Sequence, residues 1–176
     1  MHFISLNIQD VILIRHKRHY DERGDFMELF RHETFTQRCG DFCFVQDNLS
    51  RSRQGTLRGL HYQRRKSQGK LVQVVTGTIF DVAVDLRETS TTYGQWVGTK
   101  LSATEDSSLW VPPGFAHGFY VMSEEAHVLY KCTDYYVPEF EATLNWADPT
   151  LAIKWPILEH VPLFLSEKDR NAPFWL

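Results

Sequence analysis

The sequence contains no long run of apolar residues. Near its N-terminus, the apolar residues are interrupted by Asn7, Gln9 and Asp10. A secretory signal needs an apolar core of roughly 7–15 residues, and a membrane-spanning helix needs about 20. The sequence therefore predicts neither a signal peptide nor a membrane partner, and we expect a cytoplasmic protein.

Cysteine is scarce, and neither sign of charge dominates. The three cysteines, Cys39, Cys43 and Cys132, are odd in number and lack the spacing of a disulfide framework. We therefore expect free thiols in a reducing compartment. The formal net charge is −3, whereas nucleic-acid binding needs a basic face that neutralises phosphates. This composition argues against a nucleic-acid partner and favours a small anionic ligand in a local basic pocket.

Sustained helical periodicity is also missing. The 176 residues are enough for one domain with a full core, which we assign to residues 1–176. Short apolar runs separated by Gly and Pro predict about eight to ten strands. The expected fold is all-β, a jelly roll or a small barrel whose interior can hold a ligand.

The clearest strand signal lies in residues 71–87, where Gly77 separates two β-branched runs and predicts a hairpin. Its second half alternates apolar with more polar residues, so one face is expected to be core. Residues 42–48 also predict a strand, followed by a loop rich in Ser and Arg. Residues 20–25 have the composition of a turn or loop, and residues 26–38 fit either a strand or a short helix.

The segment Gly55–Lys70 concentrates candidate functional side chains. Strand alternation places His61 and Gln63 on one face and Arg58 on the other. Gly59 lies between them, and a glycine inside a strand often marks a bulge that re-aims its neighbours. Arg58 and His61 can then face one cavity. The alternative is a basic edge strand exposed to solvent.

A strand histidine and a second one after a Pro-Pro-Gly turn, His117, resemble the cupin superfamily. Many cupins bind a metal through an HxH pair, a carboxylate and a later histidine. In this sequence, Gln63 stands at the second histidine position, and residues 64–68 supply no carboxylate. Two imidazoles are too few ligands for a catalytic metal, and Arg58 and Lys70 would repel a cation. We therefore predict a pocket without a metal or other cofactor.

In such a pocket, His61 can act as a general base near neutral pH. Lys70 can stabilise the enolate that forms when a proton is removed next to a carbonyl. A phenol on the opposite wall could return the proton from the other side. Tyr130 is the candidate for this role, and Tyr135 and Tyr136 are nearby competitors. The alternative for any one of these tyrosines is a packing role.

Several motifs occur in order along most of the chain and indicate a family. They are DERG from Asp21, FVQDNLS from Phe44, LRGLHYQ from Leu57, GKLV from Gly69, FDVAVD from Phe80, YGQW from Tyr93, WVPPGFAHGF from Trp110 and YKCTDYY from Tyr130. Together they resemble the dTDP-4-dehydrorhamnose 3,5-epimerase family over about residues 10–169. The resemblance implies a metal-independent homodimer with the cupin-type jelly roll, a double-stranded β-helix with short peripheral helices. It further implies dTDP-4-dehydro-6-deoxy-D-glucose as substrate, in dTDP-L-rhamnose biosynthesis.

The resemblance also implies catalytic roles. His61 corresponds to the base, and Asp169 corresponds to its acidic partner. Lys70 corresponds to the lysine near the sugar C4 oxygen. Tyr130 corresponds to the acid that reprotonates the sugar from the opposite face. Because C3 and C5 both flank the C4 ketone, one base can serve both centres through an enolate.

Nine further positions correspond to residues that contact the nucleotide-sugar in the family: Arg23, Phe26, Glu28, Gln46, Asn48, Arg58, His117, Glu141 and Lys168. An arginine fork suits a diphosphate, and Phe26 can stack on thymine. For Glu28, Gln46 and Asn48, the alternative is ordinary hydrogen bonding at strand ends. For His117, the alternative is a structural role inside the barrel.

Three other functions remain open at this point. The first is a mono-epimerase of dTDP-4-keto sugars, because relatives that invert one carbon keep the same base. The second is a cupin that binds a sugar nucleotide without catalysis. The third is a metal-dependent cupin oxygenase or isomerase, which the missing ligands disfavour.

Overall fold

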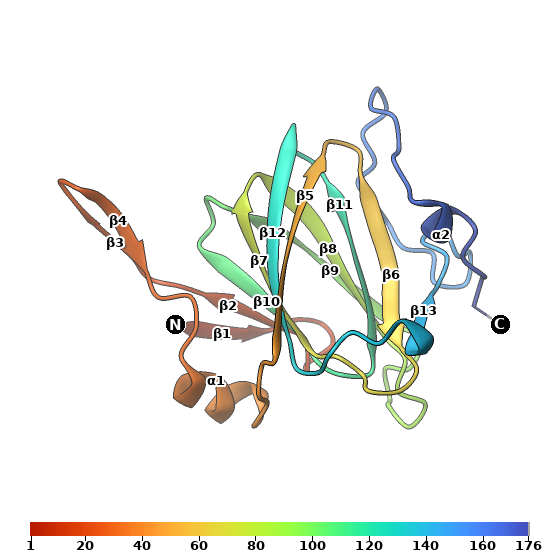
Figure 1. Cartoon of the computed structure of the whole chain (residues 1–176), viewed down its shortest axis with the longest axis horizontal. Coiled ribbons are helices and arrows are strands. Elements are labelled where there is room, and N and C mark those ends of the chain that lie inside the picture. Colours follow the sequence, from red (N-terminus) through yellow and green to blue (C-terminus); the bar gives the residue numbers. More distant parts are fainter. Residues whose placement is uncertain (176) are drawn as a thin grey trace.

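Two β-sheets facing each other make up most of the protein (Figure 1). The computed structural model describes residues 1–175. The strand order is β1-β2-β10-β7-β12-β5 in the six-stranded sheet and β13-β6-β11-β8-β9 in the five-stranded sheet, and β3 and β4 form a separate pair. This arrangement confirms the expected all-β jelly roll with short peripheral helices.

The elements have the following bounds. The strands are β1 (His2–Ser5), β2 (Ile12–Arg15), β3 (Arg18–Asp21), β4 (Gly24–Met27), β5 (Gln46–Arg53), β6 (Leu57–Gln63), β7 (Lys70–Thr76), β8 (Thr78–Asp85), β9 (Trp96–Ser102), β10 (Ser107–Val111), β11 (Phe115–Val121), β12 (Glu125–Cys132) and β13 (Glu141–Thr143). The helices are α1 (His32–Cys39), the 3₁₀ turn η1 (Pro138–Phe140) and α2 (Glu167–Arg170). Neither α1 nor α2, the α-helices of residues 1–175, is long or apolar enough to span a bilayer.

The space between the two sheets changes from apolar to polar along the strands. Val72 on β7 and Phe119 on β11 belong to the apolar core between the sheets. Two residues before each of them, on the same face of the strand, are Lys70 and His117, and both are buried. Asp81 on β8 is fully buried as well. The inward-facing rows thus continue from a hydrophobic core into a polar layer.

The two strands expected around Gly77 are present as β7 and β8, but they do not form a hairpin. β7 lies in the six-stranded sheet and β8 in the five-stranded sheet, so the chain crosses between the sheets at this turn. Gly77 has a φ of 82°, and a Cβ there would lie 2.0 Å from the Glu125 carbonyl oxygen. The turn therefore requires glycine.

The expectation that β8 has a single core face is also wrong. Ile79 and Ala83 pack between the sheets. Val82 and Val84, on the other face, pack against apolar side chains of the C-terminal segment such as Trp155. Both faces are buried because the chain after β13 covers the outside of the five-stranded sheet (Figure 1).

The strand predicted over residues 42–48 is misplaced. The strand β5 begins at Gln46 and runs through the segment expected to be a Ser/Arg loop. Phe42 and Phe44 instead pack their rings against Trp110, whose centroid lies 5.1 and 6.0 Å from theirs. The sequence of β5 did not indicate a strand, because its inward-facing side chains are polar and contact the polar layer, and most of its outward-facing side chains are charged. Hydrophobic alternation is therefore absent from it.

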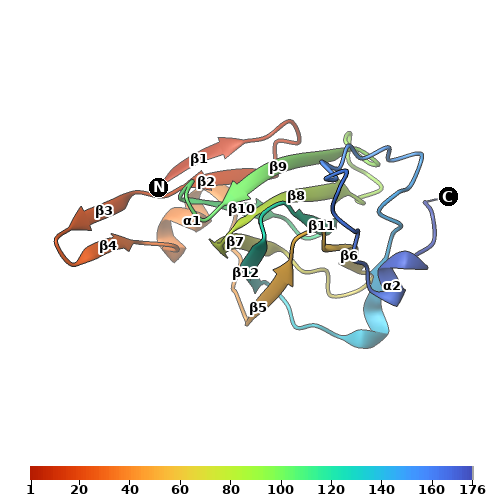
Figure 2. The same cartoon turned by 90° about the horizontal axis from the view of Figure 1, so that it is seen from above.

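Residues 20–25, expected to form a turn or loop, belong to the β3–β4 hairpin, which projects away from the two sheets in both views (Figures 1 and 2). Arg18 at its base pairs with Asp25 across the hairpin and with Asp106 in the turn before β10. The ambiguous segment 26–38 ends β4 and begins α1, whose Phe35 packs on the outer face of the six-stranded sheet.

The bulge expected at Gly59 is confirmed. Across β6 and β11, His61 pairs with His117 and Arg58 pairs with Phe119. Two residues therefore lie between the paired positions on β6 and only one on β11, so β6 carries one extra residue. The Gly59 φ is 135°, and a Cβ there would lie 2.6 Å from the Gly118 Cα. The two glycines let the backbones approach, and the extra residue turns Arg58 and His61 towards one cavity.

We expect Gly59→Ala to destabilise the protein by about 3 kcal/mol, because it adds a backbone clash to an unfavourable φ. Urea unfolding of wild type and variant measures this loss. Gly24→Ala is the matched control, because Gly24 has a φ of 128° and a Cβ added there would meet no atom within 4 Å; it should cost only about 1 kcal/mol. Equal losses in the two variants would show that the close approach to Gly118 is unimportant.

Candidate active site

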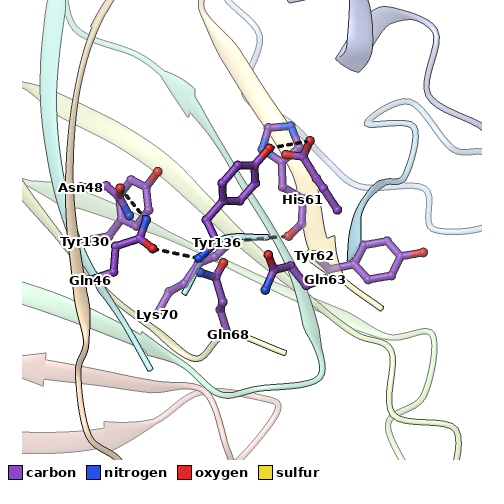
Figure 3. A pocket seen from close by; sticks show the side chains of 10 residues that line it. Gln46, Asn48, His61, Tyr62, Gln63, Gln68, Lys70, Tyr130 and Tyr136 are labelled. Atoms are coloured by element: carbon purple, nitrogen blue, oxygen red, sulfur yellow. Dashed lines mark hydrogen bonds between the residues drawn. The ribbon is translucent and has the colours of Figure 1, made fainter. Parts of the chain in front are cut away.

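The polar layer opens into a cavity of about 260 Å³, which we call the histidine pocket. Figure 3 shows Gln46, Asn48 and Tyr130 on one wall, His61 on the other, and Lys70 low between them. Its lining residues are Gln46, Asn48, His61, Tyr62, Gln63, Gln68, Lys70, Tyr130, Tyr136 and Glu141. These side chains come mainly from β5, β6, β7 and β12, so rigid strands of both sheets position them.

His61 is held by a carboxylate from the other end of the chain. Its Nε2 lies 2.5 Å from Asp169 Oδ1, and the exposed fractions of the two side chains are 29% and 3%. Asp169 sits on α2, where the Ser166 side chain accepts a hydrogen bond from its backbone N–H. Because an ionised carboxylate can only accept, it fixes the proton on Nε2 and leaves Nδ1 with a lone pair that can take a proton.

The environment of Asp169 favours its charged form. Burial by itself raises the pKa of Asp169, but the hydrogen bond and charge of His61, with smaller contributions from Ser166 and Lys168, outweigh burial and hold the pKa below its usual value. Asp169 is thus a stable anion beside the imidazole. It can orient the ring and stabilise the imidazolium that forms when His61 accepts a proton.

Lys70 lies at the inner end of the pocket. It is buried, and its Nζ donates to the His61 carbonyl oxygen at 3.5 Å. Burial lowers the pKa of Lys70, and nearby acidic groups partly oppose this effect. A buried ammonium at this position is suited to stabilise an oxyanion, because the low local dielectric strengthens their attraction.

Two of the three tyrosines considered from the sequence line the histidine pocket. Tyr130 is in β12, opposite Asn48 and Val72 in the strand register. Burial raises the pKa of its phenol, which therefore stays protonated at neutral pH and can donate a proton. Tyr136 lies at the rim, 46% exposed, and its hydroxyl donates to Glu141 at 3.2 Å. Tyr135 is 59% exposed and lies outside the pocket lining.

A second cavity of about 570 Å³ meets the first at His61. We call it the arginine pocket, because Arg51, Arg53, Arg58 and Lys168 are among its lining residues. The Arg58 Nε donates to the buried Ser52 hydroxyl at 3.0 Å, which fixes one edge of the guanidinium. This excess of cations makes the arginine pocket suitable for a phosphate group.

The other predicted contact residues of the cavity region lie as follows. Gln46 and Asn48 are joined by a 3.0 Å hydrogen bond inside the histidine pocket. Glu141 and Lys168 form an ion pair of 2.6 Å at its rim. His117 is buried below the pocket lining and bonds to Asp81 through Nε2 at 2.8 Å.

The structure does not bring Arg23, Phe26 and Glu28 to either cavity of the same chain. Arg23 and Phe26 belong to the projecting hairpin, and Phe26 is 72% exposed. Arg23 pairs with Asp21, and Glu28 pairs with Arg31. These three residues, which the sequence predicted to contact the nucleotide-sugar, therefore lie away from the other predicted contact residues.

Some lining residues were not assigned from the sequence. Gln63 shares the inward face of β6 with His61, as alternation predicts, and its side chain donates to the Lys66 and Tyr135 carbonyls. Gln68 donates to the Asp134 carbonyl at 2.8 Å. No pattern indicates Gln68, because it follows an irregular loop. Within residues 1–175, no cluster of three His, Cys, Asp or Glu side chains is arranged to hold a metal ion.

Residues 5–176 match the family model described as dTDP-4-dehydrorhamnose 3,5-epimerase. A protein of that name from Pseudomonas aeruginosa is 55% identical over 168 residues, which cover 95% of this chain and 92% of that protein. The crystal structure of a dTDP-6-deoxy-D-glucose-3,5-epimerase from Legionella pneumophila, in complex with dTDP-4-keto-L-rhamnose, is 50% identical with a TM-score of 0.94, covering 98% of this chain and 92% of that one. A 3′-monoepimerase from Streptomyces bikiniensis in complex with dTDP-quinovose is 35% identical with a TM-score of 0.89, covering 99% and 87%.

We expect Asp169→Asn to lower the free energy of unfolding near pH 7 by about 1.5–3 kcal/mol, the usual worth of a hydrogen bond to a charged group. The pKa of Asp169 is depressed in the folded protein. Its contribution is therefore complete above the ordinary Asp value of about 3.9 and disappears as the pH falls through the lower folded value. Urea unfolding at pH 7, 5 and 3.5 should show the same difference between the two proteins at pH 7 and 5, and a smaller difference at pH 3.5.

The control is Asp47→Asn, because Asp47 forms an exposed ion pair with Lys131 and should contribute less than about 1 kcal/mol at any of these pH values. A stability difference for Asp169→Asn that stays constant with pH would contradict a role for the carboxylate charge.

Proposed function

The chain belongs to the dTDP-4-dehydrorhamnose 3,5-epimerase family, and from that premise we propose that it is an isomerase inverting C3 and C5 of dTDP-4-dehydro-6-deoxy-D-glucose. The product is dTDP-4-dehydro-L-rhamnose, an intermediate on the way to dTDP-L-rhamnose. The observation that carries this proposal is the His61–Asp169 pair on one wall of a cavity, with Tyr130 on the other wall and Lys70 between them.

The proposed reaction starts with His61. Its Nδ1 takes the proton from the carbon next to the C4 ketone, the C–H electron pair forms the enolate, and negative charge moves to the C4 oxygen. Asp169 stabilises the resulting imidazolium, and the Lys70 ammonium stabilises the oxyanion. No cofactor takes part in these steps. The same sequence serves C3 and C5, because both carbons flank the ketone.

Tyr130 completes each inversion. Its phenol donates a proton to the same carbon from the opposite side, and the phenolate is reprotonated from solvent, to which His61 releases its proton. The raised pKa of Tyr130 supports this role, because the phenol carries its proton throughout the neutral range. Tyr136 is less suited, since its hydroxyl donates to Glu141 at the rim.

The sugar ring and the diphosphate of the substrate are assigned to the two adjoining pockets. A volume of about 260 Å³ is below the roughly 300–1,000 Å³ of pockets that hold a whole small ligand, so we assign the sugar ring to the histidine pocket. The diphosphate then lies towards the arginine pocket, near Arg58 and Lys168. Gln46, Asn48 and Glu141 are assigned to polar contacts with the nucleotide-sugar, whereas His117, buried below the pocket lining and bonded to Asp81, is assigned to the alternative structural role inside the barrel.

We propose a homodimer in which the projecting hairpin serves the partner chain. Tyr20 and Phe26 on this hairpin are 76% and 72% exposed. The outward side of β5 and β7 carries Leu49 and Val75, which are 66% and 54% exposed. Large apolar side chains exposed on the hairpin and on this sheet face are suited to contact with another protein surface. A second copy would cover this face, and Arg23, Phe26 and Glu28 would reach the partner's nucleotide.

We also propose that residues 1–176 form one catalytic domain that works in the cytoplasm. The three cysteines are free thiols in the structure, which suits a reducing compartment.

The direct test is proton NMR of dTDP-4-dehydro-6-deoxyglucose in D₂O with the protein, with a reductase present to trap the product. We expect deuterium at C3 and C5 and trapped dTDP-L-rhamnose. His61→Ala should lose exchange at both carbons by about 10²–10⁴-fold, the usual contribution of a general base. Tyr130→Phe should slow inversion more than exchange. Tyr135→Phe is the control, because Tyr135 lies outside the pocket, and it should behave as wild type.

Full exchange in His61→Ala would remove His61 from the role of base. Exchange at a single carbon in the wild-type protein would identify a mono-epimerase. Binding of dTDP without any exchange would identify a non-catalytic binding protein, and exchange that requires an added transition metal would revive the metal-dependent alternative.

The homodimer predicts complementation between two impaired variants. In a dimer of one Phe26→Ala chain and one His61→Ala chain, one of the two sites combines an intact His61 with an intact hairpin from its partner. Random mixing should restore roughly a quarter of wild-type activity at low substrate, since half of the dimers are mixed and each has one complete site. Activity no higher than the average of the separate variants would show that the hairpin does not serve the partner's site.

A further inference from the structure

The segment after β12 forms part of the rim of the histidine pocket, and glutamine side chains hold its backbone there. The Gln68 side chain donates to the Asp134 carbonyl at 2.8 Å, and the Tyr136 N–H donates to Gln46 Oε1 at 2.8 Å. Gln63 binds the backbone on both sides of Tyr136. Figure 3 shows the three glutamines around the backbone from which the Tyr136 ring extends.

The Gln63 amide uses its acceptor and both of its donors. Its Oε1 accepts from the Val137 N–H at 2.6 Å, and its Nε2 donates to the carbonyls of Lys66 at 2.7 Å and Tyr135 at 3.2 Å. Because a backbone N–H can only donate, the bond from Val137 fixes which way the amide points. Gln63 is 5% exposed, so water cannot readily replace a bond that is lost.

These bonds connect the loop between β6 and β7 with the segment between β12 and η1. Since Gln63 bonds to the residues before and after Tyr136, it fixes the backbone that carries this ring. At the other end of the side chain, the Tyr136 hydroxyl donates to Glu141 at 3.2 Å. The ring is therefore held at both ends and, although Tyr136 is 46% exposed, forms a rigid surface at the pocket rim.

A rigid aromatic surface can bind a ligand with little loss of conformational entropy. We propose that Gln63 is a positioning residue for the reaction: it holds the Tyr136 ring against the sugar of the bound nucleotide-sugar. This inference rests on the proposed function, which assigns the sugar ring to the histidine pocket that Tyr136 lines. The effect concerns binding more than proton transfer, because Asp169 orients His61 independently of these bonds.

The test is Gln63→Met, which keeps the approximate length of the side chain and removes its bonds to Lys66, Tyr135 and Val137. In the substrate exchange assay, kcat/KM should fall by about 10–10²-fold, the range expected when a binding group is misplaced by up to about 1 Å. Most of the loss should be in KM, and kcat should change by less than about threefold. A fall in kcat with an unchanged KM would contradict the proposal.

A double variant shows whether Gln63 acts through Tyr136. Tyr136→Ala removes the ring, so adding Gln63→Met to it should raise KM little further, because the effects of residues that act through one another are not additive. Full additivity of the two increases in KM would overturn the proposal.

Gln73→Met is the matched control. Gln73 is another buried glutamine, 9% exposed on β7, and it lies outside the lining of the histidine and arginine pockets. This variant should keep the wild-type KM. An equal rise in KM would show that the loss of any buried amide has this effect, and it would overturn the proposal.

Backbone amide exchange of the protein with D₂O tests the Gln63 bonds without relying on activity, and its wild-type arm covers the case in which Gln63→Met does not fold. In the wild type the Val137 N–H should be protected, and rapid exchange there would overturn the proposal. In Gln63→Met it should exchange at least about tenfold faster, whereas the Thr133 N–H, which donates to the Gly69 carbonyl at 3.0 Å, should be unchanged. If the wild-type protein transfers no deuterium to the substrate, the epimerase assignment fails, whereas the protection of Val137 still shows whether Gln63 holds the segment.

Discussion

The hydrogen bond between His61 and Asp169 ties together two parts of the chain that are 108 residues apart in sequence. It depends on the C-terminal segment, because α2 has only four residues and cannot be stable alone. That segment is held by apolar packing of side chains such as Trp155 and Trp175 on the outer face of β8. Burial outside the barrel thus fixes the position of the carboxylate that acts inside it.

The same strands supply both the stability of the fold and its chemistry. Val72 and Phe119 pack between the sheets, and the next inward positions, Lys70 and His117, belong to the polar layer. A rigid hydrophobic core therefore lies directly below groups whose placement must be accurate to fractions of an ångström. The glycine pair at Gly59 and Gly118 adds the one irregularity that turns Arg58 towards the cavity.

Sequence patterns predicted the parts of this molecule in which one physical rule dominates. The β-branched runs on either side of Gly77 predicted β7 and β8, and Gly59 marked the bulge. Alternation could not show that β7 and β8 enter different sheets, since pairing is decided by distant segments. It also concealed Asp81: a buried carboxylate looks like a solvent-facing residue until its partner, His117, is known.

The residues of the candidate site likewise fall into those that the sequence predicted and those that it did not. Family motifs placed His61, Lys70, Tyr130 and Asp169 in one set, and the structure brings these four side chains together. Their roles remain proposals. Patterns gave no position for Gln68, which follows a loop, and could not tell Tyr130 from Tyr136, because the difference between them is burial and a partner at the rim.

The polarity of β5 has a further consequence for the behaviour of the chain in a crowded cell. β5 pairs with β12 on one side and ends the six-stranded sheet on the other. An outermost strand can recruit strands from other molecules and so begin aggregation. Asp47, Arg51 and Arg53 are exposed along this edge, and their charges oppose such addition. The charged residues that made β5 hard to recognise from its sequence thus also disfavour its pairing with strands of other molecules.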